Sequence, residues 1–182
     1  MYIKNRSKYN KPIHVIQAGE FYASDKDELI GTLLGSCVAV CLFDNTIQLS
    51  GMNHFMLPGK IFKEDIFKDE SANYGITAIK KLILKMENMG SKKENMVAKI
   101  FGGGTMFQFE KKIIRVPDDN VRLAKIFLEI EDIPIIMSDV GNEYTRKIMM
   151  EVQTGKVYLK KSTNKESIEK LKKDEEQIYT KN

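Results

Sequence analysis

Few residues in this sequence could build a metal centre or a disulfide framework, because its 182 residues include only two cysteines and two histidines. No CxxC or HxxxH spacing is present, so we expect no structural zinc site. Cys37 and Cys41 fall in one extended segment, where they would lie about 13 Å apart at about 3.3 Å per residue. That separation is too long for a disulfide, so we expect none. As a separate prediction, we expect no cofactor.

Long apolar runs and a large charge of one sign are also missing. The run from Val38 to Phe43 is far shorter than the ~20 apolar residues that span a bilayer. No apolar segment follows the basic residues at the N-terminus, so we expect no signal peptide and a cytoplasmic location. The net charge is +4, and clusters such as "SKKEN" mix both signs. This pattern disfavours a nucleic-acid-binding protein.

Length and composition predict one domain with its own core. The chain has 42% hydrophobic residues, and its length falls within the usual ~100–200 residues of a single domain. Strands at both ends with two helices between them favour an α+β fold over a regular βαβ series. We expect a flexible segment over 1–12, a single domain over 13–161 and a charged tail or short helix over 162–182.

Apolar periodicity and turn residues predict the individual elements. Strands are expected at 14–24, 29–44, 46–59, 96–107 and 133–140, a terminal hairpin at 147–161, and helices at 74–89 and 118–132. The second and third strands are separated by a short polar turn, so they would pair as a hairpin. The polar segment 60–75 is predicted to be a mobile loop.

Cys37 is a candidate nucleophile, because it follows Gly35 and Ser36 at the start of a strand. Backbone N–H groups at such a position lower the pKa of a thiol and can hold an oxyanion, and Gly35 lets a substrate approach closely. Free cysteine is also one of the most buried residue types, so a core cysteine is the competing interpretation. Cys41 has apolar neighbours and no adjacent turn, and we expect it to fill the core.

His54 is a candidate general base. Cys37 opens one strand of the predicted hairpin and His54 comes late in the next, so the two meet in an antiparallel pair and could form a catalytic dyad. Thr32 or Ser36 could orient the imidazole through a hydroxyl oxygen. The competing interpretations are a structural histidine and a plain strand threonine. We expect His14 to be structural.

The glycine-rich segment "IFGGGTMF" is weak evidence for nucleotide binding, because it lacks a GK[ST] ending and no helix pattern follows it. Glycines such as Gly103 and Gly104 would instead let backbone approach an active site closely. A simple bend at the end of a strand is the alternative.

Five segments together resemble the chemoreceptor glutamine deamidases, the CheD family, over residues 14–160. They are "TLLGSCVAVCLFD", "GMNHFMLP", "YGITAIKKLI", "AKIFGGGTMF" and "IPIIMSDVGNEYTRKIMMEVQTGKVYLK". The resemblance implies a mixed β-sheet sandwich with two main helices on one face, like the cytotoxic-necrotizing-factor-like cysteine hydrolases. It also implies a triad of the Cys37 nucleophile, the His54 base and Thr32. Residues Gly35, Ser36, Gly103 and Gly104 are expected at the oxyanion and substrate approach.

The activity that the resemblance implies is that of a protein-glutamine glutaminase. Its substrates are glutamines on the cytoplasmic helices of methyl-accepting chemotaxis receptors, and its further partner is a CheC-type phosphatase of phosphorylated CheY. One alternative is a non-catalytic module that regulates such a phosphatase. Another is a cysteine peptidase or transglutaminase-like enzyme, which would share the Cys–His dyad.

Overall fold

Two mixed five-stranded sheets form the frame of the residues that the computed structural model describes, which are 1–4, 10–56, 75–105 and 116–164. The first sheet has the order β1-β2-β4-β9-β10, with β1 (Tyr2–Lys4), β2 (Ile13–Val15), β4 (Leu29–Leu34), β9 (Thr145–Glu151) and β10 (Val157–Ser162). The second has the order β3-β6-β5-β7-β8, with β3 (Phe21–Ser24), β6 (Leu49–Asn53), β5 (Val38–Asp44), β7 (Met96–Gly102) and β8 (Ile135–Val140).

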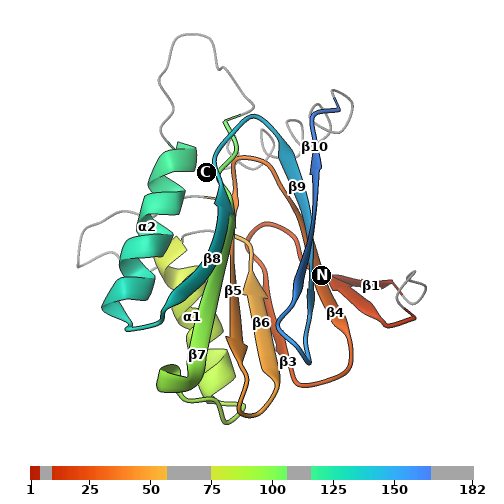
Figure 1. Ribbon diagram of the computed structural model, residues 1–182, viewed down its shortest axis with the longest axis vertical. Coiled ribbons are helices and arrows are strands. Elements are labelled where there is room, and N and C mark those ends of the chain that lie inside the picture. Colours follow the sequence, from red (N-terminus) through yellow and green to blue (C-terminus); the bar gives the residue numbers. More distant parts are fainter. Residues whose placement is uncertain (5–9, 57–74, 106–115, 165–182) are drawn as a thin grey trace.

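Two α-helices, α1 (Gly75–Glu87) and α2 (Val116–Ile130), lie on one face of the second sheet in this part of the chain, and the first sheet lies on its other side (Figure 1). A short 3-10 turn (Lys93–Asn95) precedes β7. Helix α1 buries residues spaced three and four apart, as expected for a helix with one apolar face: Ala78, Ile79, Leu82, Ile83 and Met86. No helix among the described residues is long and apolar enough to cross a membrane.

Strand β5 has an almost continuous apolar sequence because both of its faces are buried. Val38, Val40 and Leu42 point into the core under the helices, whereas Ala39 and Cys41 point into the core between the sheets. Both faces of the strand are therefore buried, and successive side chains alternate between two apolar layers. The α+β sandwich with two helices on one face that the sequence predicts is confirmed.

Two segments that were each predicted as one strand are wrong in that respect. Each consists of two strands, and the two strands belong to different sheets. Segment 14–24 divides into β2 and β3 around Gly19, whose φ of 82° suits glycine. Segment 29–44 divides into β4 and β5, and residues 35–37 carry the chain from the first sheet to the second. The break was hidden because apolar residues fill the inner faces of both sheets.

The other predicted elements differ mainly at their ends. The hairpin of β5 and β6 is confirmed, although β6 begins only at Leu49, and the hairpin of β9 and β10 is confirmed with a turn at Thr154 and Gly155. Helix α2 begins at Val116, with Pro117 in its first turn, where a missing N–H costs nothing. The predicted loop over 60–75 lies outside the described residues except for Gly75, which begins α1. The end of the strand at 106–107 and the tail from 165 also lie outside the described residues.

Candidate active site

The crossing between the two sheets places Cys37 at the start of β5. Its side chain is only 1% exposed and lies in the core between the sheets, with Leu34, Ala39 and Met56. Residues 35–37 are outside any strand, so this short segment forms a loop at the end of the sandwich. We call residues 35–37 the nucleophile loop.

Cys37 and His54 are diagonal neighbours across an antiparallel pair. The Val38 N–H donates to the Phe55 carbonyl oxygen at 3.0 Å, and the Phe55 N–H donates to the Val38 carbonyl oxygen at 2.9 Å. This register puts Cys37 opposite Met56, and it puts His54 opposite Ala39 on the same inner face. Side chains in such diagonal positions lie within reach of each other. The antiparallel register therefore places these two side chains close together, as expected from the predicted hairpin.

Thr32 approaches His54 from the opposite sheet. Its Oγ1 lies 2.8 Å from His54 Nδ1 and 2.8 Å from the carbonyl oxygen of Ile16. The single hydroxyl proton of Thr32 goes to the Ile16 carbonyl, so Oγ1 must accept the hydrogen bond from Nδ1. The proton of a neutral imidazole is therefore on Nδ1, and Nε2 carries the lone pair that a general base needs.

Burial keeps the His54 imidazole neutral. It lowers the pKa of His54 to about 4, and the negative charge of Glu20 opposes this shift in part. Backbone contacts fix the residue as well, because the His54 N–H donates to the Glu20 carbonyl at 2.9 Å and Gly19 N–H donates to the His54 carbonyl at 2.8 Å. Nε2 is buried and has no hydrogen-bond partner within the described part of the chain, so it makes no hydrogen bond to Cys37 in this structure.

The glycine segment after β7 supports the nucleophile loop from outside. Gly103 N–H donates to the Cys37 carbonyl and Gly104 N–H donates to the Gly35 carbonyl, both at 2.8 Å. A Cβ on Gly102 would lie 2.1 Å from the Cys37 carbonyl oxygen, and its φ is +113°. The amides of Gly103 and Gly104 are thus engaged with the loop itself, as a close backbone approach requires.

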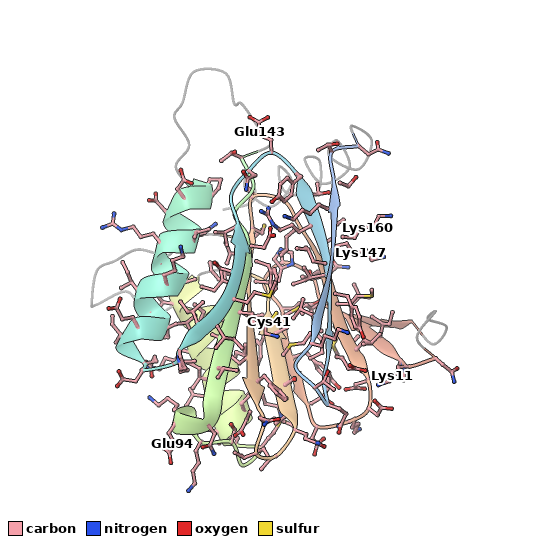
Figure 2. All side chains as sticks on the ribbon, viewed as in Figure 1. Lys11, Cys41, Glu94, Glu143, Lys147 and Lys160 are labelled. Carbon is pink, nitrogen blue, oxygen red and sulfur yellow. The ribbon has the colours of Figure 1, made fainter. Side chains whose placement is uncertain are left out.

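Cys41 and His14 lie in structural surroundings. Figure 2 shows Cys41 in the middle of the molecule, and burial raises the pKa of its thiol to about 12 although Lys99 opposes the shift. His14 Nε2 lies 2.8 Å from a Glu28 carboxylate oxygen, and its ring stacks on Tyr22 at 4.4 Å. Cys41 shares the apolar core between the sheets with Cys37, four residues away, whereas His14 lies in β2 of the first sheet with Glu28 and Tyr22 as its partners.

Three residues near the site carried no predicted role. Glu20 acts on His54 by its charge, and Asn120 of α2 donates to the Met56 carbonyl at 2.8 Å, two residues after His54. Arg146 is fully buried beside the nucleophile loop. A buried arginine has no sequence signature, because arginine is ordinarily exposed and only the fold reveals its burial.

Comparisons with known proteins identify the family of this chain. The family model "CheD chemotactic sensory transduction" matches residues 56–161. A Sulfurimonas denitrificans protein named "Probable chemoreceptor glutamine deamidase CheD" is 40% identical over 146 residues, covering 80% of this chain and 91% of that protein. A Herminiimonas arsenicoxydans protein of the same name is also 40% identical over 146 residues, covering 80% of this chain and 71% of that protein.

Among solved structures, the Bacillus licheniformis hypothetical protein YfiH is similar with a TM-score of 0.44 and 13% identity, covering 70% of this chain and 58% of that one. The fold and the sequence matches together define the class: an α+β protein of chemotaxis. The chain belongs to the CheD family. The resemblance seen in the sequence is thereby confirmed.

Proposed function

We propose that this chain is a cysteine-dependent glutaminase that converts glutamine side chains of chemotaxis receptors to glutamate. The observation that carries the proposal is the Thr32–His54 hydrogen bond, which gives a neutral base of defined tautomer beside Cys37. The names of the relatives, chemoreceptor glutamine deamidases, supply the substrate class. Because the substrate helices would be the cytoplasmic ones, the protein would act in the cytoplasm.

The reaction would proceed through a thioester. His54 Nε2 takes the Cys37 thiol proton, and the thiolate sulfur attacks the carbonyl carbon of the glutamine side chain. The carbon–nitrogen bond then breaks while His54 returns the proton to the leaving ammonia. A water gives its proton to His54 and attacks the thioester, so that glutamate is released and the Cys37 thiol is restored.

Each neighbour of the dyad would have a separate task. Thr32 would hold the imidazole in the tautomer that leaves Nε2 unprotonated, and the Glu20 charge would favour the transient imidazolium. We assign the oxyanion position to the backbone of the nucleophile loop at Ser36 and Cys37. Gly103 and Gly104 would support that loop, because their N–H groups donate to its carbonyl oxygens.

Mass spectrometry of a purified receptor cytoplasmic domain tests the proposal. Incubation with this protein should add about 1 Da at particular glutamines, since hydrolysis replaces the amide NH2 group with an OH group. A cognate receptor whose mass stays unchanged would refute the proposal and favour the non-catalytic partner of a CheC-type phosphatase. Cleaved main chain would instead indicate a peptidase, and joined amines would indicate a transglutaminase-like enzyme.

Replacing Thr32 with valine should lower the deamidation rate roughly 10²-fold, the size typical of impaired general base catalysis. Valine has nearly the same shape but cannot accept the Nδ1–H bond, so the imidazole is free to adopt the wrong tautomer. Thr32→Ser keeps the hydroxyl and is the matched control, expected to retain most of the rate. Equal rates for the two variants, measured by the same mass assay, would remove Thr32 from the mechanism.

A further inference from the structure

Arg146 is a buried arginine next to the nucleophile loop that the proposed mechanism does not use. It lies in β9, where its register partner is Leu34, the last residue of β4 before the loop. Its side chain is 0% exposed, which is rare for arginine. Burying the charge of an arginine is costly unless hydrogen-bond partners satisfy it, so the partners of Arg146 indicate what this side chain holds in place.

The guanidinium binds an acid and the turn between β8 and β9. Its Nε donates to Asp139 Oδ1 at 2.8 Å, and its Nη2 donates to the Gly141 carbonyl at 2.7 Å. Its Cζ lies over the Tyr144 ring, 4.3 Å from the ring centre. Lys161 Nζ lies 2.7 Å from the second Asp139 oxygen. Burial alone would raise the pKa of Asp139, but the hydrogen bonds from Lys161 and Arg146 hold it below its ordinary value.

The turn that Arg146 binds rests directly on the glycine segment after β7. Gly141 N–H donates to the Gly102 carbonyl, and Thr105 N–H donates to the Asn142 carbonyl, both at 2.9 Å. A Cβ on Gly104 would lie only 3.0 Å from the Tyr144 carbonyl oxygen. Figure 2 labels Glu143 of this turn at the end of the molecule where β9 begins.

The glycine segment in turn holds the nucleophile loop, through the bonds of Gly103 to Cys37 and of Gly104 to Gly35. Three backbone layers are therefore stacked: turn 141–144, segment 102–105 and loop 35–37. Arg146 binds the outermost of these layers with several donors in a fixed plane. A small displacement of turn 141–144 would therefore also displace segment 102–105 and, through the Gly103 hydrogen bond, the backbone of Cys37.

We propose that Arg146 is a positioning residue for the Cys37 nucleophile, acting through turn 141–144 and segment 102–105. This inference rests on the proposed function for its catalytic consequence. Arg146 fixes where the sulfur sits relative to His54 and to the bound glutamine, and it does not contact the substrate. Misplacement of reacting groups by a fraction of an ångström to 1 Å lowers the rate of the chemical step more than it lowers binding.

The test compares Arg146→Lys with Lys161→Gln. Lysine keeps the charge near Asp139 but cannot donate in a fork to both the carboxylate and the turn. Lys161→Gln removes the other cation from Asp139 and the Lys161 contact with the Tyr144 ring, but it keeps the Arg146 hydrogen bond to the Gly141 carbonyl. We expect kcat for receptor deamidation to fall roughly tenfold or more in Arg146→Lys with KM unchanged. We expect kcat of Lys161→Gln to stay within about twofold of the wild-type value.

Amide hydrogen exchange at residues 103–105 gives a readout that does not depend on activity. It should quicken more in Arg146→Lys than in Lys161→Gln, because only Arg146→Lys loses the guanidinium hydrogen bond to the Gly141 carbonyl. Unchanged exchange, an unchanged kcat or a rise in KM alone would overturn the inference. If the unchanged protein does not deamidate a receptor, the proposed function fails, while the exchange rates still decide whether Arg146 holds the loop.

A second variant covers the case in which Arg146→Lys does not fold. Gly141 has a φ of +73°, and no described residue lies within 4 Å of its Cβ position. Gly141→Val should therefore displace the turn by backbone strain alone, since a β-branched residue strongly disfavours positive φ. The same fall in kcat at constant KM is expected, and a kcat equal to that of the unchanged protein would refute the role of the turn.

Discussion

Replacing Cys37 with alanine is expected to lower the deamidation rate by about 10⁴-fold or more, because the proposed thioester would form on the Cys37 sulfur. Alanine fills most of the same buried space between the sheets, so the variant should fold. The rate is measured as the mass gain of a receptor cytoplasmic domain per unit time. Retention of the rate would mean that Cys37 only fills the core, which was the competing interpretation of the sequence.

Cys41→Ala is the matched control, because both cysteines are 1% exposed and lie in the core between the sheets. Cys41 is within β5, and Cys37 directly precedes that strand. Burial raises the pKa of the Cys41 thiol to about 12, so almost no thiolate forms there at neutral pH. We expect this variant to keep its activity and to lose roughly 1 kcal/mol of unfolding free energy. A large loss of activity in the folded Cys41 variant would contradict the division of roles between the two cysteines.

Gly102→Ala is expected to have the largest effect on stability, about 3 kcal/mol or more. The added Cβ would meet the Cys37 carbonyl oxygen at 2.1 Å, and that oxygen belongs to backbone that cannot rotate away. The φ of +113° adds strain to the steric overlap. Relief requires separating β7 from the nucleophile loop, so activity should fall together with stability. Urea unfolding measures the first effect and the receptor assay the second.

Gly90→Ala separates strain from overlap. Gly90 has a similar φ of +101°, and its Cβ position has open space for 4 Å among the described residues. We expect this variant to lose about 1 kcal/mol from strain alone and to keep its activity. If the two variants lost the same unfolding free energy, the close contact between Gly102 and the Cys37 carbonyl would contribute nothing to the destabilisation.

The hairpin, and with it the position of His54 near Cys37, was accessible from the sequence because it depends on local rules. A short polar turn forces β5 and β6 to be antiparallel neighbours, and that register alone carries His54 back to Cys37. The helices were accessible for the same reason, since the apolar spacing of α1 reflects one buried face. Family membership was accessible because five such segments occur in a fixed order.

The division of 29–44 into two strands was not accessible from the sequence. A strand buried on both faces reads as one apolar run, and the pattern does not record which sheet each half joins. Thr32 illustrates the consequence. Its nearness to Cys37 in sequence suggested a role, but its contact with His54 exists because β4 lies in the opposite sheet and faces β6 across the core.

The sequence by itself determined the α+β class, the two helices, the antiparallel hairpin that joins Cys37 and His54, and membership in the CheD family. Only the tertiary structure decided the tautomer of His54, the support of Cys37 by Gly103, and the burial of Arg146. The physical reason is the range of the interactions. Periodicity and turns act within about ten residues, whereas these contacts join segments that meet only when two sheets pack face to face.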